Sequence, residues 1–500
     1  MSLKKNIIAN YASQLYVSGV GILILPLYIK YMGAEAYGLV GFFAMLQAWF
    51  GLLDMGLTPT IGRETARYHG GSMSALAYRQ LFRALSLVFL VIAIVGGTSL
   101  FFLANLVAAR WLKIESLDMS SVVVAVQIMA MSVAMRWMCG LYRGVVTGAE
   151  RLVWLSGFNT LIATLRFIAV FCSMWQFGFT ILVFFIHQLA VALVELVGLF
   201  LMGNKLLPSK KSFQQKMGWS LEPIKPVLKF SLTIAFTSSV WVLVTQTDKL
   251  ILSGILPLSE YGYFTLAVLV ASGIMLVSSP ISSAIMPRMA RLNAEGSHEE
   301  MIRVYRNATQ LVTIICGSAA ITIAFAAEKL LFGWTGDAQL AKQAAPILRL
   351  YVIGNGFLAL SAFPYYLQYA RGDLRYHLMG NVLTAGFLIP AIIYAASLAG
   401  AIGAGWVWLS LNAVFLLLWV WFVHQKLEPG LHMKWVLSDI AKISLPVIFT
   451  LWGLTFISLP EGGRLLDLSA VAILGLTALL VAIASSSYAR PFLLRRVKNG

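Results

Sequence analysis

The stretch from Tyr37-Gly38 to Ala66-Arg67 decides the fold, because the same residue pairs recur at the same spacing 224 positions later in the chain. Tyr37-Gly38 opens an apolar segment, and Tyr261-Gly262 opens a second one that has Ala290-Arg291 at the matching place. The same shift relates two further pairs: Gly148 with Gly372, and Arg151 with Arg375. An internal repeat in a very hydrophobic chain is typical of a transporter.

The composition indicates a membrane protein. Of 500 residues, 59% are apolar and only 11% are charged, which is too apolar for a soluble domain. A spanning helix needs about 20 mostly apolar residues. Fourteen segments meet this criterion: 7–29, 37–58, 84–107, 119–141, 152–173, 179–202, 229–252, 261–286, 308–327, 345–368, 378–398, 403–424, 441–459 and 467–488. We therefore expect an all-α polytopic membrane protein with about 14 transmembrane helices.

The basic residues predict the orientation of these helices. With the N-terminus inside, cytoplasmic segments hold 27 of the 37 Lys and Arg residues, and the opposite loops hold seven. Because cationic loops stay in the cytoplasm, both termini are expected there. The net charge of +17 is scattered over many short loops, which favours contact with an anionic lipid leaflet over nucleic-acid binding.

The motifs of several enzyme classes are missing from the sequence. It has no GxxxxGK[ST] phosphate loop, no HExxH, no pair of CxxC motifs and no GxSxG elbow. The loops expected on the outer side are short, so they leave no room for a catalytic domain. Cys139, Cys172 and Cys316 lie in or beside spans and indicate neither disulfides nor a metal site. The sequence predicts neither an enzyme nor a cofactor.

Several motifs together carry a resemblance to a known family. In chain order they are Asn10, Pro26-Leu27-Tyr28, Gly33 to Gly38, Leu53-Asp54-Met55-Gly56-Leu57, Tyr142-Arg143-Gly144-Val145-Val146, and Asp248 to Leu252. This series resembles the Wzx-type flippases of bacterial polysaccharide biosynthesis, which export O-antigen (lipopolysaccharide) and exopolysaccharide units. Their superfamily (MOP) also includes MATE drug exporters and MurJ-type lipid II flippases. The resemblance implies two six-helix lobes facing one another across a V-shaped cavity.

The repeat and the basic linker predict the domain organisation. We expect an N-terminal lobe over 1–203, a basic cytoplasmic linker over 204–228 and a C-terminal lobe over 229–426. Residues 427–500 would supply two further helices and a basic cytoplasmic tail. Because six spans separate the copies, the lobes are expected to be related by an axis along the membrane normal, which suits alternating access.

A lipid-linked oligosaccharide would need fixed cations for its phosphates. Arg166 lies near the middle of the fifth span, and a buried Arg costs at least ~2.5–3.5 kcal/mol unless it has a partner or faces water. It is the first candidate phosphate ligand. The alternative is a structural role, in a buried ion pair or in hydrogen bonds that link two helices. Arg136 and Arg349 are further candidates, and each could instead snorkel to an interface. Lys249 is the fourth, although it could pair with the adjacent Asp248.

Three titratable residues are candidates for ion coupling. Glu195 in the sixth span and Asp54 at the inner end of the second could bind and release H⁺ or Na⁺. Asp54 could equally cap a helix. His187 could relay a proton or donate to a carbonyl. A direct pair between Arg166 and Glu195 would need long side chains or tilted helices.

Trp241, Tyr351 and Gln246 are candidate glycan contacts, although tryptophans at span ends usually form interfacial belts. The leading hypothesis is a flippase for undecaprenyl-pyrophosphate-linked oligosaccharide in the bacterial inner membrane, in contact with membrane lipids. A polysaccharide polymerase or another assembly protein is a further candidate partner. The alternatives are a MATE-like cation or drug antiporter, which would need an acidic cavity, and a lipid II flippase. Lipid II flippases have arginines in their first, second and eighth helices. This sequence has none in the cores of those spans, so it resembles that group less in this respect.

Overall fold

The computed structural model describes residues 3–54, 56–209, 221–456 and 463–491. The middle of the predicted basic linker (210–220) and the end of the basic tail (492–500) therefore lie outside the described residues. Nearly all the rest is helical, and twelve helices among the described residues are long and apolar enough to cross a membrane. The predicted all-α polytopic fold class is confirmed.

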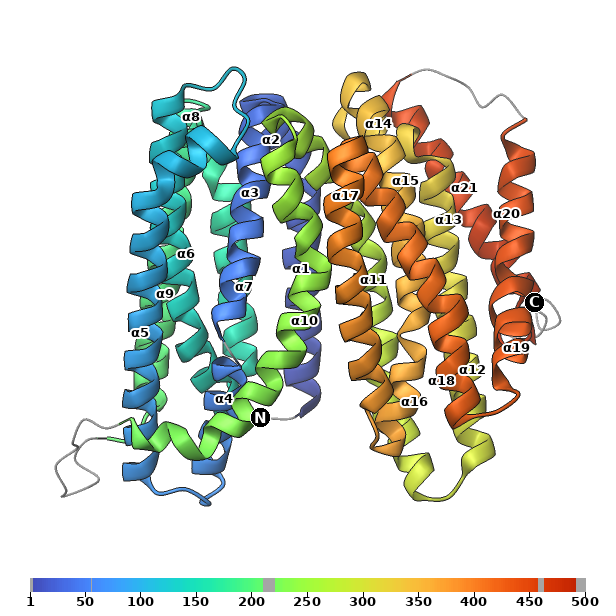
Figure 1. The fold of residues 1–500 in the computed structure, drawn as a ribbon, viewed down its shortest axis with the longest axis horizontal. Coiled ribbons are helices and arrows are strands. Elements are labelled where there is room, and N and C mark those ends of the chain that lie inside the picture. The colour runs from blue at the N-terminus through green and yellow to red at the C-terminus, as the bar shows by residue number, and fades with distance from the viewer. Residues whose placement is uncertain (1–2, 55, 210–220, 457–462, 492–500) are drawn as a thin grey trace. The chain divides into compact units, whose positions relative to one another are not determined.

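The chain divides into two compact units, Met1–Gly262 and Tyr263–Gly500. The first contains α1 (Leu3–Leu23), α2 (Leu25–Met32), α3 (Ala34–Phe50), α4 (Leu57–His69), α5 (Ala75–Leu106), α6 (Met119–Gly148), α7 (Leu152–Thr164), α8 (Val170–Phe177), α9 (Ile181–Leu206) and α10 (Lys225–Ile255) (Figure 1). Helix α11 (Leu258–Ala294) begins in the first unit and continues into the second.

The second unit continues with α12 (His298–Val312), α13 (Ser318–Phe325), α14 (Ala327–Thr335), α15 (Ala338–Ser361), α16 (Phe363–Arg371), α17 (Arg375–Val414), α18 (Val420–Leu427), α19 (Leu431–Lys434), α20 (Lys442–Leu454) and α21 (Arg464–Ser485). Five short π-helical turns continue the long helices: η2 (Val107–Trp111), η3 (Leu165–Ala169), η6 (Thr313–Gly317), η7 (Phe415–Trp419) and η8 (Trp435–Ala441).

The number of spans depends on two elements. The candidate span Arg375–Leu427 has 53 residues, and its backbone leaves helical geometry at Ala399 and Gly400, between the two spans predicted there. Helix α10 has 31 residues and covers the predicted seventh span, although it is not among the twelve candidates. The count of fourteen, and the lobe boundaries at 203, 229 and 426, stay predictions.

The break in α17 depends on glycine. Gly400 has φ +53°, a conformation that costs a residue with a Cβ. A Cβ on Gly403 would overlap the carbonyl of Ala395, so the two segments can approach closely only with glycine there. A Cβ on Gly405 would likewise lie 2.9 Å from the side chain of Leu350, so this glycine too allows close helix packing.

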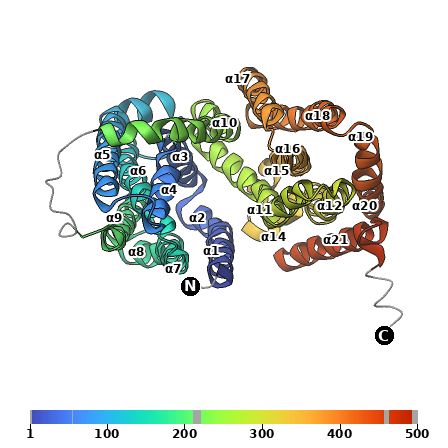
Figure 2. The same ribbon diagram turned by 90° about the horizontal axis from the view of Figure 1, so that it is seen from below.

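The core of the first unit lies among α4, α5, α6 and α9, where large apolar side chains such as Phe89, Leu141 and Leu199 are fully buried. In the second unit α21 packs on α13, α14 and α20, and Ile443, Val447 and Ala478 are buried between them. Figure 2 shows α20 and α21 at one side of this unit. The last two predicted helices are therefore integral to its packing.

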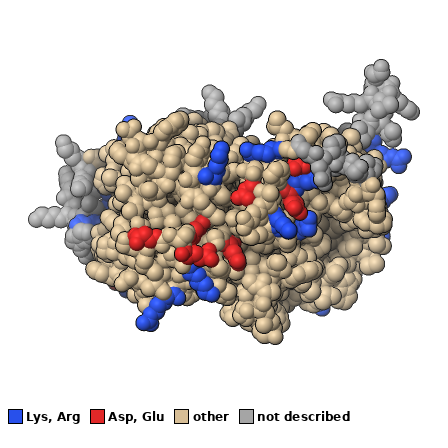
Figure 3. All heavy atoms as spheres, turned by 90° about the horizontal axis from the view of Figure 1, so that it is seen from above, with Lys and Arg blue, Asp and Glu red and all other residues tan. Residues whose placement is uncertain are grey.

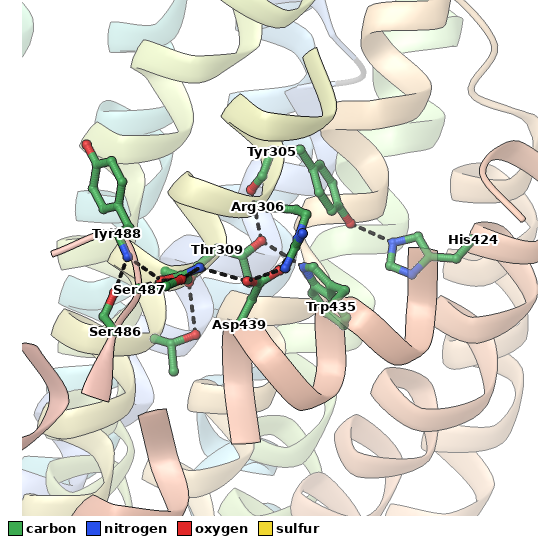
Figure 4. A network of polar contacts seen from close by, with 11 residues as sticks. Tyr305, Arg306, Thr309, His424, Trp435, Asp439, Ser486, Ser487 and Tyr488 are labelled. Carbon is green, nitrogen blue, oxygen red and sulfur yellow. Dashed lines mark hydrogen bonds and ion pairs between the residues drawn. The ribbon is translucent and has the colours of Figure 1, made fainter. Parts of the chain in front are cut away.

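A polar network fastens these last helices to α12 (Figure 4). Asp439 of η8 accepts hydrogen bonds from Arg306 Nε (2.7 Å), Arg306 Nη2 (3.1 Å) and Gln310 Nε2 (2.8 Å). The Oε1 atom of Gln310 accepts from the turn after α21, through Ser486 Oγ (2.7 Å) and the Tyr488 amide (3.0 Å). One carboxylate and one amide thus join three separate segments of the chain.

Figure 3 shows the face that is uppermost in Figure 1. Charged side chains of both signs are scattered over it, and most of its surface is uncharged. A single-sign patch of the kind that binds nucleic acid is not seen on this face.

Candidate functional site

Charged residues of two helices, α6 and α9, meet inside the first unit. Glu195 of α9 lies between two arginines of α6 that are seven residues apart and so share one helix face. Arg143 Nη2 is 2.8 Å from Glu195 Oε1, and Arg136 Nε is 3.9 Å from Glu195 Oε2. The Glu195 side chain is only 9% exposed. Two guanidinium groups therefore neutralise one buried carboxylate.

Arg136 is held inside the unit rather than at an interface. Its Nη1 donates to Gln47 Oε1 of α3 (2.8 Å) and its Nη2 to Gln188 Oε1 of α9 (3.0 Å). Its side chain is 9% exposed. The snorkelling alternative for Arg136 is therefore wrong, because neutral amides bind the guanidinium between helices.

Arg143 is not among the candidates chosen from the sequence, because it lies just beyond the predicted span 119–141 and is counted with a cytoplasmic loop. The structure extends α6 to Gly148, so Arg143 lies within a candidate span. Besides Glu195, it donates from Nη1 to Asn159 Oδ1 (2.9 Å). The signal for Arg143 was present in the motif Tyr142-Arg143-Gly144.

Arg166 lies on the π-turn η3, in the middle of the fifth predicted span. Its guanidinium carbon is 5.4 Å from the centroid of the Phe167 ring. Its Nε atom is buried and has no hydrogen-bond partner among the described residues, as is also true of Arg136 Nε. Within the same described part, the ion pairs of Glu195 go to Arg136 and Arg143 rather than to Arg166.

Three arginines and one glutamate leave this cluster with an excess of two positive charges. We call Arg136, Arg143, Arg166 and Glu195 the arginine cluster. Uncompensated positive charge within a membrane-spanning region is costly, and such residues usually mark a substrate or ion path. Guanidinium groups bind phosphate with paired, charge-assisted hydrogen bonds. The cluster is therefore suited to an anion.

His187 lies next to this cluster. Its Nε2 is 2.9 Å from the carbonyl oxygen of Leu165, and its Nδ1 is 2.8 Å from Ser173 Oγ. A carbonyl oxygen can only accept, so Nε2 carries the proton of this bond. The geometry shows the carbonyl contact that the sequence offered as one alternative, and the proton relay stays a prediction.

The remaining candidates lie elsewhere. Asp54 accepts from the backbone N of Thr58 (3.2 Å) and from its Oγ1 (2.6 Å), which is the capping alternative. Lys249 Nζ bonds Thr245 O (2.6 Å) and pairs with Asp248 Oδ1 (3.3 Å), as the local alternative expects. Arg349 is an exposed residue of α15, in the second unit. Substrate or coupling roles for these residues stay predictions.

The three candidate glycan contacts are also dispersed. Trp241 is exposed on α10, and Gln246 donates to Thr245 Oγ1 (3.5 Å). Tyr351 is 2% exposed and stacks on Trp408, with ring centroids 5.9 Å apart. A glycan could reach Tyr351 only if its neighbours moved, so the structure assigns it a packing role in this conformation. Among the described residues, no group of three or more His, Cys, Asp or Glu side chains could hold a metal ion.

Solved structures define the class of this fold. A protein described as "Lipid II flippase MurJ, inward closed conformation" is similar with a TM-score of 0.74 and 13% identity, covering 96% of this chain and 98% of that one. A multidrug resistance MATE family transporter of the MOP superfamily, inward-facing, has a TM-score of 0.62 and 14% identity, covering 84% and 96%. A MOP superfamily transporter from Pyrococcus furiosus has a TM-score of 0.54 and 13% identity, covering 84% and 95%. The chain thus has the fold of MOP-superfamily transporters.

The family is shown by sequence. A family model described as "Polysaccharide biosynthesis protein" matches residues 3–293, which is more than half of the chain. The protein therefore belongs to this polysaccharide biosynthesis family, and the resemblance seen in the sequence motifs is confirmed. A comparison with curated proteins finds no match.

Proposed function

We propose that this protein is a flippase that moves undecaprenyl-pyrophosphate-linked oligosaccharide, an O-antigen or exopolysaccharide unit, from the inner to the outer leaflet. The observation that carries the proposal is the excess of two positive charges in the arginine cluster of a polysaccharide biosynthesis family member. The pyrophosphate is the one part of such a substrate that needs fixed cations, because the polyprenyl tail can stay in lipid. The mechanism would be alternating access driven by H⁺ or Na⁺.

The proposal includes a location and an orientation. The basic residues of the loops favour a bacterial inner membrane with both termini in the cytoplasm, as the positive-inside rule requires. Cytoplasmic loops would then be available to a polysaccharide polymerase or another assembly protein. A MATE-like cation exporter is disfavoured, because a cationic substrate would meet like charge at the arginine cluster.

Export of a glycan tests the proposal directly. In a strain that lacks its own exporter, the intact chain is expected to restore glycan on the cell surface. Arg166→Ala should lower export by about 10- to 100-fold at matched expression, since charge-assisted hydrogen bonds contribute about 1.5–3 kcal/mol. Arg166→Lys should keep part of the activity because it keeps the charge.

Arg291→Ala is the matched control, because Arg291 of α11 is an arginine of the other unit whose side chain is 68% exposed. It should export as well as the intact chain. Failure of the intact, inserted chain in several glycan backgrounds would contradict the proposal. Rescue of a strain depleted of its lipid II flippase, without glycan export, would favour the lipid II alternative, whose structural counterpart shares this fold.

The variant Glu195→Gln distinguishes two roles for Glu195, that of a counter-ion to the arginines and that of the carboxylate that couples export to H⁺ or Na⁺. The amide keeps an acceptor for Arg143 but raises the excess charge of the arginine cluster from two to three. We expect the variant to bind inorganic pyrophosphate several-fold more tightly, measured as thermal stabilisation in detergent, and to export more slowly because release is delayed. Unchanged pyrophosphate binding with export that no longer responds to a H⁺ or Na⁺ gradient would support the coupling role instead.

A further inference from the structure

The backbone that carries Arg166 has an unusual hydrogen-bond pattern. In the π-turn η3 the regular α-helical bonding of the backbone is interrupted. Three successive carbonyls here accept hydrogen bonds from side chains of other helices. The pairs are Leu165 O with His187 Nε2 (2.9 Å), Arg166 O with Gln188 Nε2 (2.9 Å) and Phe167 O with Tyr28 OH (3.0 Å).

Gln188 also has a second hydrogen bond, which goes to the guanidinium of an arginine of α6. Its Nε2 donates to the carbonyl of Arg166, so its Oε1 must point the other way, where it accepts from Arg136 Nη2 (3.0 Å). Gln188 is only 3% exposed, so water does not compete strongly for either bond. A single amide therefore bridges the backbone of one arginine and the guanidinium of another.

The amide also preserves charge. Gln188 and Gln47 are the hydrogen-bond acceptors of the two terminal nitrogens of Arg136, and both are neutral. A carboxylate at either position would cancel one of the two excess charges of the arginine cluster. The neutral bridge thus fixes Arg136 while leaving its charge available to an anion.

We infer that Gln188 is a positioning residue that sets Arg136 relative to Arg166 for binding one phosphate-containing anion. This inference rests on the proposed function, because it requires that both arginines bind the substrate. The Nε atoms of Arg136 and Arg166 have no hydrogen-bond partner among the described residues. Each would donate a hydrogen bond to the bound anion. His187 and Tyr28 hold the flanking carbonyls and so support the same turn.

If Gln188 only linked two helices, it would make the same contacts. The test must therefore separate the positioning of the arginines from the stability of the protein. We would measure glycan export of Gln188→Leu in the intact chain and in the Arg166→Ala chain, at matched expression. If Gln188 acts through Arg166, Gln188→Leu lowers export about tenfold alone but less than twofold in the Arg166→Ala chain. Equal fold losses in both backgrounds would overturn the inference.

Gln188→Glu addresses the possibility that Gln188→Leu fails to fold. It keeps the side-chain volume, loses the donor to the Arg166 carbonyl and adds a negative charge beside Arg136. Weaker stabilisation of the detergent-purified variant by inorganic pyrophosphate is expected, with normal thermal unfolding in its absence. Pyrophosphate stabilisation equal to that of the intact chain would overturn the inference.

Asn412→Leu is the matched control, because Asn412 is also a buried amide and bonds Trp408 O (2.8 Å) in the second unit. Its effect on export should be the same fold-change with and without Arg166. If Arg166→Ala is silent while Arg136→Ala or Arg143→Ala lowers export, the inference fails and the proposed function stands. If all three arginine variants export normally, the inference also fails, while export by the intact chain still supports the proposed function. The proposed function itself fails only if the intact chain does not restore export.

Discussion

Asp439→Ala is expected to lower the free energy of unfolding by about 1.5–3 kcal/mol, the usual contribution of hydrogen bonds to a charged group. Asp439 is 0% exposed and accepts three hydrogen bonds, two from Arg306 and one from Gln310. Its loss would leave Arg306, whose side chain is 33% exposed, without its counter-charge. It would also release the amide that fastens the end of α21 (Figure 4). Equilibrium unfolding in detergent measures the change.

Asp373→Ala is the matched control. Asp373 also pairs with an arginine, Arg375, at 2.6 Å, but the arginine side chain is 79% exposed. Exposed pairs contribute little to stability. The melting temperature of Asp373→Ala should therefore stay close to that of the intact chain. Equal losses in the two variants would show that the buried network of η8 is not what stabilises the second unit.

Replacing both partners sharpens the test. In a chain with Asp439→Leu and Arg306→Met, no charge is left without a partner, and apolar side chains fill a similar volume. Such exchanges are often neutral or stabilising. We expect the double variant to recover most of the stability that Asp439→Ala loses. A double variant as unstable as Asp439→Ala would locate the defect in Gln310, which would still lack its acceptor.

Most of the fold follows from the sequence because hydrophobic segments of sufficient length have few alternatives in a bilayer. The Gly400 break and the two flanking spans were predictable because glycine interrupts an otherwise apolar run. The π-turns were not predictable, since no residue type requires them. The two copies of the repeat also differ in backbone conformation at equivalent positions, which the sequence did not predict. Gly372 has φ +72°, whereas near its counterpart Gly148 the residue with positive φ is Glu150 (φ +56°), two positions further on.

The candidate site was predicted in part. Arg136, Arg166, Glu195 and His187 were selected one by one, as polar residues in apolar spans, and the structure brings all four to one region of the first unit. Their partners could not be chosen, because contacts between helices depend on rotation and tilt rather than on position along the chain. For that reason Gln188, the residue that joins Arg136 to Arg166, had no signal beyond its place beside His187.

Gly38→Ala is expected to destabilise the first unit and to abolish most export. A Cβ on Gly38 would overlap the carbonyl group of Leu258, and a Cβ on Gly262 would lie 2.6 Å from the carbonyl oxygen of Ala34. Backbone atoms cannot rotate away as a side chain can, so the start of α3 would have to separate from the start of α11. Overpacking of this kind costs about 1–3 kcal/mol and sometimes more.

The two glycines are also the repeat-related residues of the sequence, 224 positions apart. The structure shows that the motif Tyr37-Gly38 packs directly against its own copy, Tyr261-Gly262. The repeat could be predicted from the sequence, but this crossing could not. Since both glycines fill equivalent places in one contact, Gly262→Ala should reproduce the loss of stability and export seen with Gly38→Ala.

Gly19→Ala is the control for both variants, because Gly19 also lies within a helix and no atom lies within 4 Å of its added Cβ. Alanine is the better helix former by about 1 kcal/mol, so Gly19→Ala should keep or slightly raise stability. Thermal unfolding in detergent and surface glycan are measured on the same preparations. Normal stability and export of Gly38→Ala would mean that α3 and α11 need not approach this closely for the protein to fold or to work.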